Sequence, residues 1–180
     1  MTAAQFSGGF RPEQVGTTLG RSAAYAFSQA QIDRFAELTG DRQWLHTDPV
    51  RAAAGPYGAP VAHGYLILAL IPALSAPVLA LQERGTAINL GLDRVRFVRA
   101  LRTGERFYDD IVLGALTERP EGQRLSCEHT LRLAESGETL AVVTTVTLLI
   151  PAAGTESGPE HPPGGPPIPG NPGNSIRSAP

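Results

Sequence analysis

The sequence predicts an α+β fold, a long central helix wrapped by an antiparallel β-sheet. Residues 65–81 are almost wholly apolar and uncharged, whereas residues 87–150 consist of short strand-like runs separated by turns. A helix that lacks a polar face needs burial on every side, and strands joined by short turns pair antiparallel. We therefore expect a sheet of six or seven strands that curls round the helix. Its unpaired edge favours a homodimer.

We expect one domain between two segments of different character. Residues 19–150 carry the predicted elements and are long enough to bury a core. Residues 1–18 show no regular pattern and are expected to be irregular. Half of residues 151–180 are proline or glycine, a composition that cannot offset its ordering entropy by burial. This last segment is predicted to be a disordered tail.

Charge and cysteine content limit the function classes. The net charge of −2 gives no reason to expect nucleic acid or an anionic membrane as a partner. Cys127 is the only cysteine, so no intrachain disulfide is possible, and residues 1–11 lack a signal-peptide pattern. We expect a cytoplasmic protein. Pro72 and Pro77 interrupt the apolar segment and no basic residues flank it, which favours a buried helix over a membrane span.

The first half of the chain is expected to be short elements and one long helix. Residues 22–27 fit a strand, and Ser28 with Gln31 fits a capping box for a helix over residues 29–39, which Gly40 ends. Residues 41–47 are expected to form a loop. A short helix then starts at Asp48-Pro49 and ends at Gly55. The apolar helix begins at Gly64.

The second half is expected to be strands. Residues 87–92 and 93–98 form one interrupted run, followed by strands over 106–116, 123–133 and 139–150. The run 123–133 alternates, with Leu125, Cys127, Leu131 and Leu133 on one face. His129 shares this face and has no evident partner in the sequence. These runs are joined by turns at 120–122 and 135–138.

Asp41 and His46 are the candidate catalytic residues. A carboxylate and an imidazole five residues apart, at the end of a helix, make a plausible acid–base pair. Each residue taken alone is more often structural, since Asp is common in turns. The two lie in one short segment, and His63-Gly64 follows at the start of the apolar helix. That combination favours proton transfer beside a polarised carbonyl.

Gly64 is the candidate oxyanion residue. The first N–H groups of a helix lack internal partners, and glycine lets a ligand approach them closely. The alternative is that His63-Gly64 only shapes the entry into the helix, and the residues themselves leave both open. His46, Asp48 and His63 offer metal-binding side chains, but Asp48 is expected to cap a helix and no further ligand completes a tetrahedral set. We expect neither a metal nor another cofactor.

Several motifs in order resemble the MaoC-like dehydratases, the group of (R)-specific enoyl-CoA hydratases with a hot-dog fold. They are Phe35-Ala-Glu-Leu-Thr-Gly-Asp41, Leu45-His46, Asp48-Pro49, Ala62-His63-Gly64 and residues 89–97. The resemblance extends over about residues 28–150 and is strongest to the subgroup of the nodulation protein NodN. It implies a hot-dog fold and a catalytic dyad of Asp41 and His46. The dyad would hold a water that adds to a trans-2-enoyl thioester, whose carbonyl oxygen is polarised at Gly64.

The chain departs from the family pattern between the two catalytic residues. The hydratases have Asn-Pro where this chain has Gln43-Trp44. Trp44 is much bulkier than proline, so it either narrows the acyl pocket, together with His63 and Tyr65, or anchors the loop.

The expected activity is therefore hydration or dehydration of an acyl-CoA or acyl-carrier thioester. A hot-dog thioesterase and a non-catalytic acyl-thioester binding protein remain as alternatives, because a fold does not select a reaction. Four arginines at positions 94, 96, 99 and 102 either contact CoA phosphates or form a solvated face.

Overall fold

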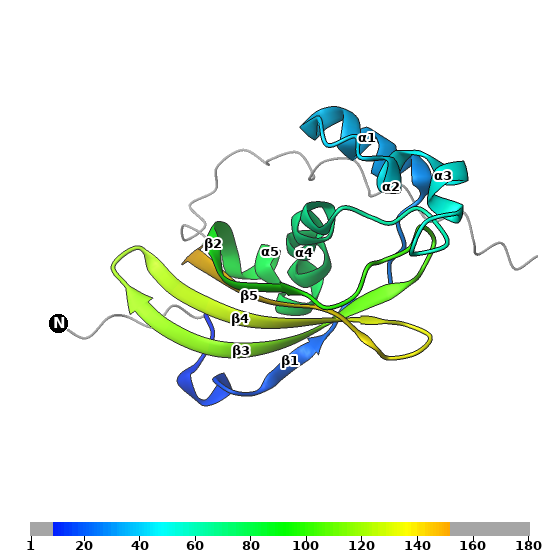
Figure 1. Cartoon of the computed structure of the whole chain (residues 1–180). Helices are drawn as coiled ribbons and strands as arrows, with labels where there is room; N and C mark the ends of the chain where they lie inside the picture. The colour runs from blue at the N-terminus through cyan, green and yellow to red at the C-terminus, as the bar shows by residue number, and fades with distance from the viewer. Residues whose placement is uncertain (1–8, 152–180) are drawn as a thin grey trace, which may run out of the picture.

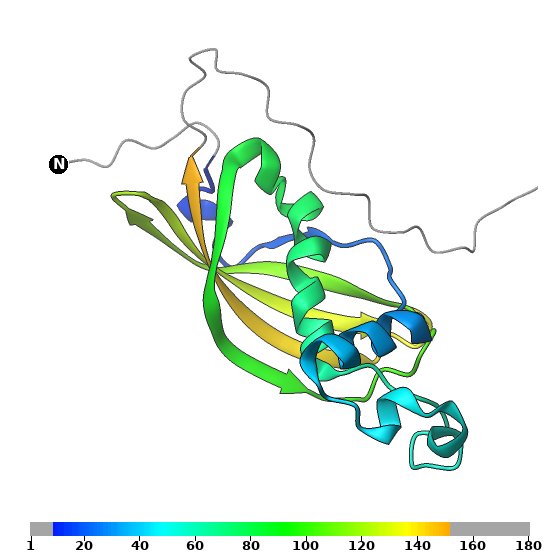
Figure 2. The same ribbon diagram turned by 90° about the horizontal axis from the view of Figure 1, so that it is seen from above.

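The computed structural model describes residues 9–151, and the side chains of residues 82 and 83 are not described. It contains a five-stranded antiparallel sheet in the order β1-β3-β4-β5-β2. The long helix α4 lies across one face of this sheet (Figures 1 and 2). The strands are β1 (Thr18–Arg21), β2 (Gly85–Phe97), β3 (Phe107–Arg119), β4 (Gly122–Leu133) and β5 (Thr139–Pro151). The fold class is thus as predicted.

The strand count is lower than the predicted six or seven. Residues 85–97 form one strand, because two irregularities in its pairing with β5, at Asn89/Gly91 and Leu92/Arg94, let the strand bend without ending. The segment 22–27 is not a strand: β1 precedes it, and within it only Tyr25 forms an isolated bridge, to Phe107. The other predicted strands occur with ends shifted by one to three residues.

The helices before α4 follow the capping signals in the sequence. Helix α1 (Gln29–Thr39) starts with the predicted capping box, in which Ser28 and Gln31 exchange hydrogen bonds. Gly40 ends it in a left-handed conformation with φ 80°, which glycine adopts without strain. Residues 44–47, expected to be loop, form the one-turn helix α2 (Trp44–Thr47).

The short helix α3 (Pro49–Ala53) begins as predicted, with the Asp48 carboxylate accepting a hydrogen bond from the Arg51 N–H. The remaining helices are a 3₁₀ turn (Pro12–Gln14), α4 (Gly64–Leu79) and α5 (Leu81–Arg84). Helices α1, α2 and α3 gather beyond the N-terminal end of α4 (Figure 2). No helix in residues 9–151 has the length and apolar character that a membrane span requires.

Helix α4 is buried on one face only, whereas the sequence predicts burial all round. Ile67, Ile71 and Leu74 pack in the core, but Tyr65 is 75% exposed and Ala69 and Pro72 are also exposed. The sheet curves against one side of the helix and does not enclose it (Figure 1). An apolar strip of α4 is therefore left open in the single chain.

Residues 1–8 and 152–180 lie outside the described residues, and with them the first eight residues of the predicted irregular segment and nearly all of the predicted tail.

Candidate active site

Asp41, His46 and His63 meet at the N-terminal end of α4. A carboxylate oxygen of Asp41, a ring nitrogen of His46 and a ring nitrogen of His63 all lie within 4.8 Å of one another. The three residues reach this point from the end of α1, from α2 and from the residue before α4. Asp41 is exposed, His46 is half-buried and His63 is buried. The dyad that the sequence suggested is therefore close in space.

The His46 ring is oriented by the backbone. Its Nδ1 lies 2.7 Å from the Val61 carbonyl oxygen, and a carbonyl only accepts, so Nδ1 carries the proton. Nε2 is then an unprotonated acceptor. Burial is the main cause that lowers the pKa of His46, and the neighbouring His63 lowers it further. The neutral imidazole is thus favoured, and it offers a free lone pair.

The His63 ring holds Asp41 in place. Its Nε2 donates to the backbone carbonyl oxygen of Asp41 at 2.9 Å. The ring stacks on His46 with centroids 3.8 Å apart, and it contacts Phe35 in a tilted arrangement with centroids 5.1 Å apart. Its Nδ1 is buried without a hydrogen-bond partner among the described residues. His63 therefore connects the end of α1 to the start of α4.

Three such side chains raise the question of a metal ion. Two histidines and a carboxylate are a known ligand set. The His46 and His63 rings, however, are inclined by only 24° in a face-to-face stack. Because a ligating nitrogen binds a metal in the plane of its ring, nearly parallel stacked rings do not aim their lone pairs at one point. The arrangement suits a water molecule between acid and base groups better.

The N-terminus of α4 provides hydrogen-bond donors next to this group. No hydrogen bond to another described residue reaches the N–H groups of Gly64 and Tyr65. A Cβ added at Gly64 would lie 2.7 Å from the Phe97 ring, so the position has no room for a side chain unless that ring moves. Gly64 and Phe97 line a cavity of about 330 Å³ with Tyr57, Ile67 and Arg99. A carbonyl oxygen placed at Gly64 would meet these free donors.

Comparisons with known proteins agree with this geometry. Residues 11–123 match the family model described as MaoC like domain. The chain belongs to the MaoC-like family.

Two curated relatives are similar over part of their length. The 3-hydroxyacyl-thioester dehydratase Z of Mycobacterium tuberculosis is 43% identical over 91 residues, which cover 51% of this chain and 60% of that protein. Nodulation protein N of Rhizobium meliloti is 44% identical over 101 residues, covering 55% and 63%. The chain thus spans about three fifths of the curated relatives it matches.

Solved structures support the hot-dog fold. The MaoC-like dehydratase from Rhodospirillum rubrum aligns with a TM-score of 0.66 at 22% identity, covering 81% of this chain and 99% of that one. The (R)-hydratase from A. caviae aligns with a TM-score of 0.63 at 24% identity, covering 75% and 96%. At identities of 22% and 24%, the similarity to these two structures is evidence of a shared fold only.

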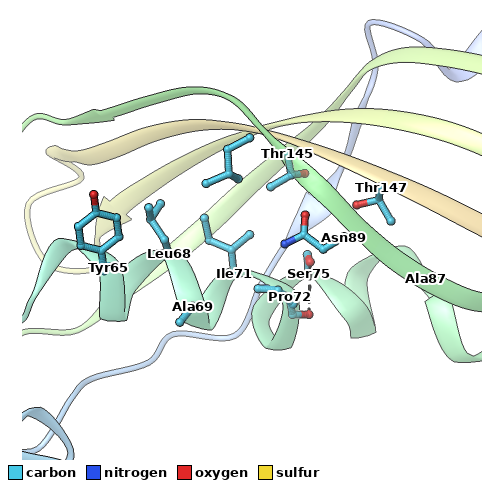
Figure 3. Close-up of a pocket in the computed structure, with 11 residues that line it drawn as sticks. Tyr65, Leu68, Ala69, Ile71, Pro72, Ser75, Ala87, Asn89, Thr145 and Thr147 are labelled. Carbon is cyan, nitrogen blue, oxygen red and sulfur yellow. Dashed lines mark hydrogen bonds between the residues drawn. The ribbon is translucent and has the colours of Figure 1, made fainter. Parts of the chain in front are cut away.

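In this MaoC-like chain, Trp44 contacts helix α3 and Gly55, which follows this helix. The guanidinium of Arg51 lies 4.6 Å from the centre of the indole ring, and a Cβ added at Gly55 would lie 3.0 Å from its edge. Trp44 does not line the described cavities near α4. Tyr65 does line one, a cavity of about 310 Å³ between α4, β2 and β5 (Figure 3). The observed contacts of Trp44 are those of a loop anchor.

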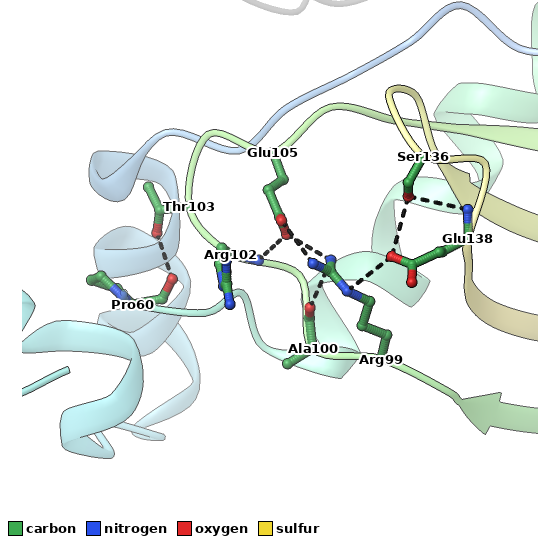
Figure 4. A network of polar contacts seen from close by, with 8 residues as sticks. All are labelled: Pro60, Arg99, Ala100, Arg102, Thr103, Glu105, Ser136 and Glu138. Atoms are coloured by element: carbon green, nitrogen blue, oxygen red, sulfur yellow. Dashed lines mark hydrogen bonds and ion pairs between the residues drawn. The ribbon is translucent and has the colours of Figure 1, made fainter. Parts of the chain in front are cut away.

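Arg99, one of the four arginines singled out in the sequence, is held in ion pairs within the chain. Arg99 forms a two-point ion pair with Glu105, at 2.9 and 3.0 Å, and lies 3.6 Å from Glu138 (Figure 4). Glu105 also accepts from the Arg102 backbone N–H. Hydrogen bonding to Arg99 and Arg102 lowers the pKa of Glu105, against the opposing effect of burial. Arg99 therefore braces the segment after β2.

Sequence reasoning missed two groups of residues. Gln29, the first residue of α1, donates to the His46 carbonyl oxygen at 2.7 Å and accepts from Thr103 at 3.1 Å, which ties α2 to α1. His129 does have a partner: its Nδ1 lies 2.6 Å from Oδ2 of Asp109. Both contacts join residues far apart in the chain, so no local pattern indicates them.

Proposed function

We propose that this chain is a hydro-lyase that hydrates a trans-2-enoyl thioester, or dehydrates the corresponding hydroxyacyl thioester. The observation that carries the proposal is that Asp41 and His46 meet at His63, the residue directly before the free N–H groups of Gly64 and Tyr65. Hydration requires an acid–base pair and a polarised carbonyl, and these residues supply both. The 3-hydroxyacyl-thioester dehydratase among the relatives supports the same reaction class.

The reaction would begin with a water between the dyad residues. Hydrogen bonds of about 2.8 Å to each atom allow one water to bridge groups that lie up to 4.8 Å apart. As the water oxygen bonds to the β-carbon, one dyad group accepts its proton. The other dyad group delivers a proton to the α-carbon, so H and OH add across the double bond. The first group then passes its proton to the second, which returns the dyad to its starting state. The unprotonated Nε2 suits His46 to accept the proton.

The start of α4 would stabilise the charge that develops on the thioester oxygen. As the nucleophile adds, electron density moves to this oxygen and returns when the α-carbon is protonated. The free N–H groups of Gly64 and Tyr65 are fixed donors that need no rearrangement at that moment. The positive end of the helix dipole acts in the same direction.

The substrate pocket would use His63 and Tyr65 at the start of α4. His63 fixes the position of Asp41 from the buried side, and Tyr65 borders the cavity beside α4. An acyl-CoA or acyl-carrier thioester is the substrate class we propose. Trp44 would affect the pocket through the loop that it anchors.

We also propose a homodimer through β2. This strand is the long edge of the sheet, and Ile88, Leu90, Leu92 and Phe97 on it are each 42–53% exposed. The open apolar strip of α4 is adjacent. An unpaired edge beside exposed apolar surface favours association, and a second copy of the chain would cover both.

Turnover of crotonyl-CoA by the purified chain tests the function. Hydration removes the absorbance of the enoyl thioester without releasing free CoA. Release of free thiol with no hydroxyacyl product would indicate the thioesterase alternative. Binding without turnover would indicate a non-catalytic acyl-thioester binding protein.

A further inference from the structure

A layer of polar side chains crosses the core beneath α4. His129 Nδ1 lies 2.6 Å from Oδ2 of Asp109, and His129 Nε2 lies 3.0 Å from the hydroxyl oxygen of Thr145. Asp109, His129 and Thr145 come from the adjacent strands β3, β4 and β5. Asp109 is 0% and His129 1% exposed. The three side chains therefore form one continuous hydrogen-bonded row.

This row divides the apolar core in two. On β3, Asp109 stands between Phe107 and Ile111, which belong to different apolar clusters. On β4, His129 stands between Leu131 and Cys127, which belong to the same two clusters. An aspartate and a histidine thus occupy positions where the strand pattern calls for apolar side chains.

A buried pair of this kind is weak evidence of a stabilising role. Replacing a buried ion pair by apolar residues is often neutral or stabilising. Oδ1 of Asp109 is buried without a hydrogen-bond partner among the described residues. Burial is the main cause that raises the pKa of Asp109, against the opposing effect of His129. The layer carries a cost of desolvation, which suggests a role beyond holding the sheet together.

Thr145 is the member of the row that reaches a cavity. It lines the space of about 310 Å³ between α4, β2 and β5 (Figure 3). Leu68, Ile71, Pro72 and Leu92 form apolar walls of this cavity, and the polar groups on it are mainly those of Ser75, Asn89, Thr145 and Thr147. The lining thus suits a mostly apolar ligand with one polar group part-way along it.

The Asn89 amide adds a donor on the facing wall. Its side-chain oxygen accepts from the Gly91 N–H at 3.2 Å, which leaves the NH₂ group without a hydrogen bond to another described residue. A ligand hydroxyl both donates and accepts. It can therefore pair with Asn89 and with Thr145, whichever way the proton lies between Thr145 and His129.

We propose that this cavity selects an acyl chain that bears a hydroxyl group several carbons from the thioester. Thr145 contacts this hydroxyl, and His129 and Asp109 are positioning residues that fix the Thr145 side chain. The inference rests on the proposed function, because the chain would enter from a thioester bound at Gly64. The cavity runs from Tyr65 to Ser75, ten residues or roughly 15 Å along α4. An extended chain of about ten carbons matches this length.

Isothermal titration with saturated acyl-CoA ligands tests the proposal without requiring turnover. Octanoyl, decanoyl and dodecanoyl chains with a terminal hydroxyl are each compared with the analogue that has a methyl group in its place. We expect one chain length to prefer the hydroxyl, by about threefold to tenfold in Kd, the range of a single net hydrogen bond. Equal Kd values for hydroxyl and methyl analogues at every length would overturn the proposal.

Variants of two neighbouring threonines provide the matched control. Thr145→Val keeps the shape and should abolish the preference, whereas Thr145→Ser should retain it. Thr147→Val alters the same strand and cavity, but Thr147 has no described hydrogen bond to a buried histidine, so the preference should persist. Persistence in Thr145→Val, or equal loss in both valine variants, would contradict the assignment.

Asp109→Asn tests the positioning role. It should reduce the preference for the hydroxyl while the Kd of the methyl analogue stays unchanged, and an unchanged preference would remove the buried pair from the proposal. If the wild-type chain bound no acyl-CoA, the proposed function itself would fail. If it bound all chains equally, only the hydroxyl selection would fail.

Discussion

The imidazole rings of His46 and His63 stack with their centroids 3.8 Å apart, and each ring donates a hydrogen bond to a backbone carbonyl oxygen. His46 donates to Val61, and His63 donates to Asp41. These hydrogen bonds fix the tautomer of both rings, and the stack joins both members of the proposed dyad to the start of α4.

The rate of hydration should fall on the acid side with an apparent pKa below 6.5. Burial lowers the pKa of His46 from its ordinary value of 6.5, and protonation removes the free lone pair of Nε2. A pH profile of kcat/KM measures this limb. An apparent pKa clearly above 6.5 for this limb would show that another group controls the rate.

The lowered pKa of His46 also makes the stability of the fold depend on pH. Between the folded pKa and 6.5, the unfolded chain binds more protons at His46 than the folded chain does. The contribution of His46 to stability is therefore present above 6.5 and is lost as the pH falls through the folded pKa. His46→Gln should weaken the acid-side loss of Tm, and an unchanged profile in this variant would contradict the prediction.

His63→Phe should lower kcat by about tenfold to a hundredfold, because displacing a catalytic group by about 1 Å has costs of this size. The phenyl ring keeps the stack on His46 but cannot donate to the Asp41 carbonyl. The Tm should change little, since the substitution also removes the unpartnered Nδ1. His63→Gln, which retains a donor, should recover part of the rate. Full activity in His63→Phe would remove His63 from the site.

Trp44→Ala should lower activity on short and long enoyl-CoA substrates together. The ring packs against Gly55 and Arg51, so its loss should loosen the segment that carries His46. We expect the free energy of unfolding to fall by about 2 kcal/mol. This is below the range for a fully buried ring, because Trp44 is half-buried. Chemical denaturation measures this change. A selective gain for long chains would show instead that the ring limits the acyl pocket.

Cys127 should resist alkylation in the folded protein. Burial raises its pKa to about 11, and the nearby Asp109 acts in the same direction, so little thiolate exists at pH 8. Mass spectrometry after iodoacetamide treatment should find Cys127 unmodified until denaturant is added. Rapid modification of the native protein would indicate that the core around β4 opens easily.

Local signals in the sequence predict much of the fold. The capping box at Ser28 and the stop at Gly40 place α1 correctly, and the alternation in residues 123–133 places the buried face of β4. The break inside residues 85–97 was misleading, since bulges bend a strand without ending it. The exposed strip of α4 was not predicted, because hydrophobicity alone does not show which faces a single chain leaves open.

The site residues that lie close together in the sequence could be predicted from it. The contacts between residues far apart in the chain could not. Asp41 and His46 are near in sequence, and the structure brings both to His63. The contact of Gln29 with His46 and that of Asp109 with His129 join separate elements, so only the tertiary fold reveals them. The position of Trp44 in the motif suggested either a pocket residue or a loop anchor. Its actual contacts depend on how α2 and α3 pack, which the sequence does not show.

Hydration of crotonyl-CoA by the wild-type chain and by Asp41→Asn and His46→Gln tests the central claim most directly. Asp41→Asn is isosteric, and His46→Gln keeps a polar side chain. Neither position is fully buried, so matched Tm values can establish that the variants are folded. We expect wild-type turnover and a loss of about 10²–10⁴-fold in kcat for each variant. Wild-type rates in a folded Asp41→Asn or His46→Gln protein would contradict the proposed dyad.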